Sequence, residues 1–319
     1  MKPFKTHDEQ IEILKSRGLI IEDEQRNQVK EFLKLENYYN VINGYKDLFL
    51  SEHSSNQFKA NTSFHDIYVL HQLDRHFRRL FLPDLLIFET NLKSLLAYHF
   101  SEAFQTCASF LTIENYHPNS HRQANKLISD LSKLIAYKSE HNGPIKHHLD
   151  HYNHVPLWVL TKFMTFGQTV QMYRSLMPAL KNAIAKEFAL TFNRDYHCFI
   201  ELTPSDLESI MKTANFFRNI CAHEERLYNF KLYKRPRTAR IASILNIDQQ
   251  LIADGNIFTM IAMLKLVRPK TEYDNLKERI ESSFFLFQSF VEPIQVFQSV
   301  SFQEIMNQMG FVQGWKTII

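Results

Sequence analysis

Glycine is scarce in this sequence, with seven residues among 319. Strand-turn-strand folds and phosphate-binding loops both consume glycine, because it is the residue that most easily adopts a positive φ. The low count argues against both and favours helices joined by short polar turns. We therefore predict an all-α bundle with no sheet of consequence.

Cysteine and long apolar runs are also scarce. Cys107, Cys198 and Cys221 lie far apart and form no C-x-x-C pair. Neither a disulfide framework nor a cysteine zinc site is expected, and a reducing compartment fits. No apolar run approaches 18 residues, and the opening MKPFKTHDEQIEIL has no apolar signal region. We expect no membrane span, no signal peptide and a cytoplasmic location.

Charge of neither sign dominates, since the formal net charge is +3 and the pI is about 8.6. This mild excess permits a nucleic-acid partner without requiring one.

Apolar residues recur at helical spacing along most of the chain. Helices are predicted over 7–17, 23–36, from Phe64 to a break at Pro83, 84–103, 121–138, 156–176, 179–190, from a Thr203 cap through Pro204 to about residue 230, 256–267, 271–290 and 301–308. Residues 51–63 and 139–154 are polar and are predicted as loops, and the softest boundaries along the chain are 51–63 and 231–255. The chain then divides into an N-terminal helical segment (1–50), a helical core (51–232) and a basic loop with helices that pack on the core (233–319).

The stretch FFRNICAHEERLYNF, residues 216–230, lies on the helix that begins near Pro204. The apolar face of that helix is predicted to contain Leu207, Ile210, Met211, Ala214, Phe217 and Cys221. Asn219, His223 and Arg226 share another face at spacings of four and three residues. Arg218 lies at the flank of the apolar face and five residues before His223, which is about 140° away on an ideal helix. A site that uses both needs a distorted turn or two chains.

Arginine and histidine together can cleave RNA without a metal. A neutral histidine can take a proton from a ribose 2′-hydroxyl, since its ordinary pKa is near neutrality. An arginine can bind the non-bridging oxygens of the phosphate and stabilise the developing charge. DNA lacks the 2′-hydroxyl and is not cleaved this way. Taken alone, the R-N-x-x-x-H spacing is a weak pattern, and a surface histidine with an arginine paired to Glu224 or Glu225 is the commoner interpretation.

Six segments in order carry a wider resemblance. They are KSRGLIIEDE (15–24), ENYYNVINGYKDLF (36–49), LHQLDRHFRRLFLPDLLIFETNLKSLL (70–96), VPLWVLTKFMTFGQTVQMYRSL (155–176), FFRNICAHEERLYN (216–229) and MGFVQGW (309–315). Together the chain resembles the Abi family of bacterial phage-resistance proteins, the AbiD/AbiF-like group, whose core belongs to the HEPN superfamily. The segment ENYYNVINGYKDLF, residues 36–49, is called the tyrosine block below. Departures from the family pattern are Asn40, Val41 and Asn43 in this block, Glu224 after the histidine, and Tyr228 where tryptophan is common.

The resemblance implies a HEPN-type helical bundle with additional N- and C-terminal helices, and a core, 51–232, that carries the RNxxxH motif. It implies a metal-independent endoribonuclease that needs no cofactor and arrests growth in phage-infected cells. Arg218 and His223 would be catalytic, with Asn219 as an orienting partner. The active form would be a homodimer that joins two copies of the motif, with RNA as its partner and neither DNA nor a membrane required.

Three further groups are candidates for binding. The segment KLYKRPRTAR, 231–240, has basic residues and no acid, so it either guides RNA or is a solvated loop. The proposed RNA-binding residues are Arg226, Lys231, Lys234, Arg235, Arg237 and Arg240. Glu89 shares a helix face with Leu85, Leu92 and Leu96, so this buried carboxylate is predicted to pair with Arg218 or another inward arginine. The histidine-rich stretch 141–154 holds His147 and His151 at metal-binding spacing, but a polar loop is the simpler interpretation.

Two alternatives to the nuclease remain open. The chain could be a non-cleaving RNA-binding or toxin–antitoxin-type regulatory module that uses the same basic cleft, with a small RNA as its partner. It could also be a protein-interaction bundle, which predicts no affinity for RNA even at low salt.

Overall fold

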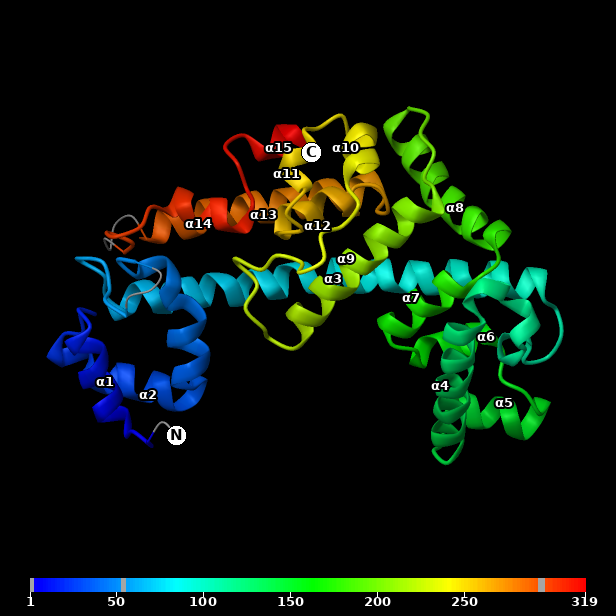
Figure 1. The fold of residues 1–319 in the computed structure, drawn as a ribbon, viewed down its shortest axis with the longest axis horizontal. Coiled ribbons are helices and arrows are strands. Elements are labelled where there is room, and N and C mark those ends of the chain that lie inside the picture. The colour runs from blue at the N-terminus through cyan, green and yellow to red at the C-terminus, as the bar shows by residue number, and fades with distance from the viewer. Residues whose placement is uncertain (1–2, 53–55, 292–295) are drawn as a thin grey trace. The chain divides into compact units, whose positions relative to one another are not determined.

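The computed structural model describes residues 3–52, 56–291 and 296–319, and their regular structure is helical (Figure 1). Within these ranges, β-type backbone pairing is limited to two isolated bridges, Ile20–Ser63 and Leu50–Phe58. The predicted all-α fold is confirmed. Among the same residues, no helix is both long enough and apolar enough to cross a membrane.

The helices follow one another with short connections. In the first third they are α1 His7–Ser16, α2 Arg26–Glu36 and α3 Phe64–Ala103, with a π turn at Tyr39–Asn43 and 3-10 turns at Asp23–Gln25 and Lys46–Phe49. The middle third contains α4 His121–Ser139, α5 Pro144–Tyr152, α6 Leu157–Leu160, α7 Phe166–Ser175, α8 Pro178–Tyr196 and α9 Pro204–Ala222. The last third contains α10 Ala239–Leu245, α11 Gln249–Ile252, α12 Ile257–Leu264, α13 Lys270–Val291, α14 Phe302–Met309 and α15 Trp315–Ile318.

The chain forms two compact units, each built from segments that are distant in sequence. Unit 1 contains residues 1–80, 220–230 and 277–316, and unit 2 contains residues 81–219, 231–276 and 317–319. The division falls inside α3, α9 and α13.

Both units have aromatic cores. In unit 1 the ring of Phe284 lies 4.9 Å from the rings of Phe77 and Phe311. In unit 2 the ring of Phe88 contacts Phe166 and Phe188, and all eight residues of α12 are buried. The abundant phenylalanines therefore fill the interior, where each buried ring contributes a large apolar area.

Helix α3 is one continuous helix of 40 residues, with Pro83 inside it (Figure 1). The predicted break at Pro83 is wrong. A proline inside a helix removes one backbone hydrogen bond, here to the carbonyl of Arg79, and its ring crowds that carbonyl. Pro83 lies on the exposed side, and the buried residues Phe81, Leu85 and Phe88 keep their helical spacing around it. Burial of that apolar stripe outweighs the lost bond.

Two other sequence predictions are corrected. The polar loop expected over 139–154 contains helix α5, which begins with Pro144 in its first turn. Proline is favoured there because its missing N–H would have no helical partner. The single helix expected over 156–176 is divided into α6, a 3-10 turn and α7. Thr165 caps α7 with a reciprocal pair of hydrogen bonds to Gln168, which ends the preceding turn.

Helix α9 begins where the sequence predicts and ends earlier. Thr203 and Asp206 form reciprocal hydrogen bonds across its first turn, with Pro204 at the first helical position. The helix ends at Ala222, so the prediction that it reaches residue 230 is wrong. Glu224 adopts a left-handed conformation with φ of 55°, and the N–H of Glu225 donates to the carbonyl of Ile220 at 3.0 Å. This is a Schellman ending, in which His223 is the C-cap residue.

Substitution of Pro83 by alanine is expected to stabilise the protein. Alanine restores a donor to the Arg79 carbonyl and removes a ring clash that costs about 3 kcal/mol in a helix interior. A more flexible unfolded chain offsets about 1 kcal/mol of that gain. Thermal unfolding of Pro83→Ala should give a higher Tm than wild type, while Ser94→Ala, an exposed change in the same helix, should alter the Tm much less. A lower Tm for Pro83→Ala would show that packing requires the proline.

Candidate functional site

The RNxxxH motif crosses the division between the two units. Arg218 and Asn219 belong to unit 2, and His223 belongs to unit 1.

In unit 2, Arg218 forms an ion pair with Glu89. The guanidinium Nε lies 3.1 Å from Oε2 of Glu89, whose side chain is only 6% exposed. The other carboxylate oxygen accepts from Lys93 Nζ at 2.6 Å, and Lys93 also donates to the carbonyl of Met164. This is the pairing that the position of Glu89 on an apolar helix face predicts. It excludes the alternative in which Arg218 pairs with Glu224 or Glu225.

Asn219 lies beside the guanidinium of Arg218. Its Oδ1 accepts from Arg218 Nη1 at 3.4 Å. The Nη2 group of Arg218 has no hydrogen-bond partner among residues 3–52, 56–291 and 296–319. The side chain is 26% exposed, so this edge of the guanidinium is available to an external acceptor.

In unit 1, His223 is exposed on the wall of a pocket of about 570 Å³. The Schellman ending of α9 places it there, because the chain turns away from the helix axis at this residue. The pocket is lined by Glu36, Tyr39, Asn40, Asn43, Gly44, Tyr45, His71, Arg75, Arg78, His223, Glu224, Glu225 and Arg226. The tyrosine block and the residues around the motif histidine therefore line the same pocket.

All three arginines that line this pocket have protein partners, and those of Arg78 are part of the buried cluster described below for Asp74. Arg75 forms a two-pronged pair with Glu36, at 2.8 and 2.6 Å, and lies 3.9 Å from Glu224. The hydrogen bond from Arg75 holds the pKa of Glu36 below its usual value, although partial burial opposes this. Arg226 donates to the carbonyl of Gly44 at 2.6 Å and lies 3.4 Å from Asp47.

The early end of α9 changes the position of Arg226. The prediction that Asn219, His223 and Arg226 share one helical face is wrong, because Arg226 lies beyond the helix. Its guanidinium instead fixes the turn at Gly44, within the tyrosine block. Its predicted role in RNA binding stays a prediction.

A buried ion pair holds the segment that follows His223. Asp74 and Arg78, one turn apart on α3, are both almost fully buried and pair with each other. Asp74 accepts from the Tyr45 hydroxyl at 2.6 Å and from the N–H of Leu227 at 3.0 Å. Arg78 donates to the carbonyl of Glu225 at 3.2 Å. The backbone on the C-terminal side of His223 is thus attached to α3 at two successive points.

Burial dominates the ionisation of this cluster. It raises the pKa of Asp74 above its usual value and outweighs the opposing effect of the Arg78 charge. Burial also raises the pKa of the Cys221 thiol to about 12, so this thiol stays protonated at neutral pH. Cys221 is therefore not a thiolate nucleophile, since the thiolate is the reactive form.

The basic segment 231–240 in unit 2 is partly neutralised. Lys231 and Arg235 both pair with Asp254, at 2.6 and 3.3 Å, and Arg240 pairs with Asp206 at 2.8 Å. The hydrogen bond from Lys231 lowers the pKa of Asp254. The segment itself contains no acid, but long-range packing brings two carboxylates to it. Its predicted contact with RNA stays a prediction for these residues and for Lys234 and Arg237.

The histidine-rich stretch 141–154 contains helix α5. His147 and His151 lie on successive turns with ring centroids 4.3 Å apart. Within the described parts of the chain, no three histidine, cysteine, aspartate or glutamate side chains converge as metal ligands would. A histidine pair alone supplies fewer ligands than the four of a structural zinc site.

Sequence reasoning did not identify His71, Arg75, Asn40 or Asn43 as neighbours of His223. The quoted ENYYNVINGYKDLF block was a signal for the two asparagines, because it is part of the family resemblance. No local pattern indicates His71, since its position at the pocket depends on the packing of α3 against residues distant in sequence.

The comparison with protein families matches residues 31–229 to the family described as "Abi-like protein". No curated protein and no solved structure matches the chain. The matched range includes the tyrosine block, helix α3 and the whole of the RNxxxH motif.

Loss of the Arg78 cation should destabilise unit 1 strongly. Arg78→Met leaves the Asp74 carboxylate buried without its cation, which costs about 3–5 kcal/mol. Thermal unfolding should show a large fall in Tm, whereas Arg79→Met, the exposed neighbour on α3, should change it little. The double variant Asp74→Asn/Arg78→Met should recover much of the loss. Equal effects of Arg78→Met and Arg79→Met would contradict the assignment.

Buried His71 should make unit 1 less stable in mild acid. Burial, aided by the Arg75 charge, lowers the pKa of His71 to about 4 from an ordinary 6.5. Below pH 6.5 the unfolded chain takes up a proton that the folded chain refuses, so the free energy of unfolding falls as pH drops to about 4. The full effect is about 3 kcal/mol.

The measurement is denaturant unfolding of wild type and His71→Phe from pH 8 to pH 4. The difference measured at pH 8 reports packing alone, because His71 is neutral in both states there. Wild type should lose more stability than His71→Phe between pH 6.5 and 4. Parallel curves would show that His71 does not resist protonation.

Proposed function

The chain belongs to the Abi-like protein family, and on that premise we propose that it is a metal-independent endoribonuclease. Membership of this family implies a role in abortive infection, a defence of bacteria against phage. The observation that carries the nuclease proposal is the placement of His223. The motif histidine is held exposed at a helix C-cap, on the wall of a pocket that is also lined by three arginines.

We assign His223 the role of general base. Its neutral imidazole accepts the proton of a ribose 2′-hydroxyl, and the 2′-oxygen attacks the adjacent phosphorus. The bond from phosphorus to the 5′-oxygen of the next nucleotide breaks, and that oxygen takes a proton. The products are a 2′,3′-cyclic phosphate and a 5′-hydroxyl end. A metal ion has no necessary part in these steps.

We assign Arg218 the role of binding the phosphate, with Asn219 as the residue that orients the Arg218 guanidinium. Support comes from the way Arg218 is held: Glu89 occupies its Nε and leaves Nη2 for an external acceptor. A guanidinium fixed at one edge can stabilise developing phosphate charge with little reorganisation. The spacing of Arg218 and His223 on the sequence supports an active homodimer, in which two copies of the motif act together.

The pocket around His223 has groups suited to an RNA nucleotide. Tyr39 is 71% exposed, and an exposed aromatic ring can stack on a base. Asn40 and Asn43 have amides that can hydrogen-bond base edges. The same groups support the second candidate, an RNA-binding module that does not cut. The two differ in whether His223 is needed for anything beyond binding.

Loss of His223 should abolish cleavage and preserve the fold. Removal of a general base lowers the rate by about 10² to 10⁴-fold. His223→Ala should therefore leave induced cells growing with intact total RNA, whereas wild type should break RNA and arrest growth. His151→Ala, an exposed histidine on α5, is the matched control and should behave as wild type. In vitro, EDTA should not inhibit, and the products should carry cyclic phosphate ends.

Glu89→Gln tests the role of the ion pair in the same assay. Loss of the carboxylate weakens a charge-assisted hydrogen bond that fixes Arg218, so kcat should fall by roughly tenfold. Wild-type cleavage in Glu89→Gln would remove Glu89 from the account. Cleavage by His223→Ala at the rate of the wild type would reject the mechanism. If the wild-type protein binds RNA and does not cleave it, the non-cleaving module is favoured.

A further inference from the structure

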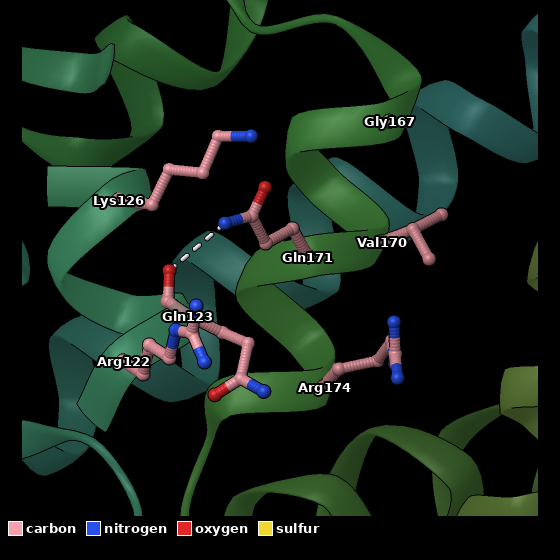
Figure 2. Close-up of a pocket in the computed structure, with 7 residues that line it drawn as sticks. All are labelled: Arg122, Gln123, Lys126, Gly167, Val170, Gln171 and Arg174. Atoms are coloured by element: carbon pink, nitrogen blue, oxygen red, sulfur yellow. Dashed lines mark hydrogen bonds between the residues drawn. The ribbon is translucent and has the colours of Figure 1, made fainter. Parts of the chain in front are cut away.

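A groove of about 550 Å³ lies over α4 and α7 of unit 2 (Figure 2). Its size is within the range of ligand clefts, about 300–1,000 Å³. Arg122 and Lys126 come from α4, and Arg174 comes from α7. The groove thus gathers three cations from segments about 50 residues apart, and neither segment is conspicuously basic by itself.

The base of the groove is fixed by a contact between the two helices. The side-chain amide of Gln171 on α7 donates to the carbonyl of Gln123 on α4 at 2.8 Å (Figure 2). Buried residues beneath it, including Leu127 and Val170, hold the helices together. The cations are therefore mounted on two packed helices and not on a mobile loop.

Arg122 and Lys126 are exposed and lie four residues apart on α4. Neither has an ion-pair partner within the described ranges of the chain. Like charges at this spacing repel each other and destabilise a helix slightly. A bound anion relieves that repulsion, and no carboxylate of this unit does so.

The positive charge continues from Arg174 to α9. Arg174 lies 3.0 Å from Glu208, which also pairs with Lys212 at 2.5 Å. Lys181 donates to the carbonyl of Arg174. Although partial burial opposes it, the three cations together lower the pKa of Glu208. Arg174, Lys181 and Lys212 thus act on the Glu208 carboxylate, and Arg122 and Lys126 add two cations that form no ion pair within the described ranges of the chain.

This arrangement contrasts with the basic segment 231–240. There, Asp254 and Asp206 between them neutralise three of the cations, although the sequence of the segment contains no acid. At the groove the sequence shows scattered single cations, and the fold concentrates them. The groove differs from the segment because Arg122 and Lys126, which have no ion-pair partner within the described ranges, lie on a helix that is packed against α7.

We propose that this groove binds the phosphates of a single-stranded RNA segment outside the nucleotide that is cut. That the polymer is RNA rests on the proposed function. Arginine binds phosphate oxygens in two-pronged fashion, lysine adds a point charge, and the Gln123 and Gln171 amides can contact sugars or bases.

The extended form of the charged surface favours a polymer over a small anion. Cations follow one another from α4 through Arg174 to Lys212 on α9, and the same helix carries Arg218 ten residues beyond Glu208. That separation is on the order of 15 Å along the helix axis. An enclosed cleft would suit a single phosphate, whereas a row of cations on the surface suits regularly spaced charges.

The test measures RNA affinity of the full chain in a His223→Ala background, where cleavage does not interfere. Fluorescence anisotropy with a labelled single-stranded RNA compares this protein with the same protein carrying Arg122→Gln and Lys126→Gln. The groove variant should bind about tenfold more weakly. Two lost phosphate contacts should also reduce the slope of log affinity against log salt by about 1.4.

Lys133→Gln/Lys186→Gln is the matched control, because it removes two exposed cations of unit 2 that do not line the groove. It should bind RNA within about twofold of the parent. Arg122→Lys/Lys126→Arg keeps both charges and should also retain affinity, and matched Tm values exclude misfolding. Equal affinity of the groove variant and the control would overturn the proposal.

A mononucleotide arm separates a small-ligand site from an RNA site. If a mononucleotide binds the groove while RNA affinity is unchanged in the groove variant, the RNA proposal fails. If the wild type cleaves RNA and the groove variant binds RNA with unchanged affinity, this inference is overturned and the nuclease proposal is left intact. Groove-dependent RNA binding by a wild type that cuts no RNA would overturn the nuclease and leave this inference intact.

Discussion

The ion pair between Asp74 and Arg78 is the interaction on which the presentation of His223 depends. A buried carboxylate is unstable without a cation and donors, and here one cation, one hydroxyl and one backbone N–H all contact Oδ2 of Asp74. The backbone contacts of this pair attach Glu225 and Leu227 to α3. Helix α9 ends at Ala222, and the left-handed Glu224 turns the chain away from the helix axis. His223 is therefore exposed between the end of the helix and the backbone segment that is attached to α3.

Helix α3 supplies a carboxylate to each half of the motif. Asp74 holds the segment that follows His223 in unit 1, and Glu89 holds Arg218 in unit 2. Both carboxylates are buried and both are shared with a second cation, Arg78 or Lys93. Within its own unit, each half of the motif is thus held by buried groups of the core and not by flexible surface contacts, which suits the proposed chemistry.

Much of this architecture could be predicted from the sequence where local chemistry decides it. The Thr203–Asp206 capping box set the start of α9, and the place of Glu89 on an apolar face indicated its pairing. The end of α9 could not be predicted, since a glutamate and not a glycine adopts the left-handed conformation. The continuity of α3 through Pro83 could not be predicted either, and nor could the neutralisation of residues 231–240 by Asp254. Each depends on packing between distant segments.

The central claim is that His223 activates a ribose 2′-hydroxyl, and one substitution in the substrate tests it directly. An RNA oligonucleotide that the protein cuts at a mapped position is compared with the same oligonucleotide carrying a single 2′-deoxy nucleotide on the 5′ side of the cut. The account predicts that cleavage at that position disappears while binding is unchanged, because the attacking oxygen is missing. Continued cleavage at the 2′-deoxy position would contradict it.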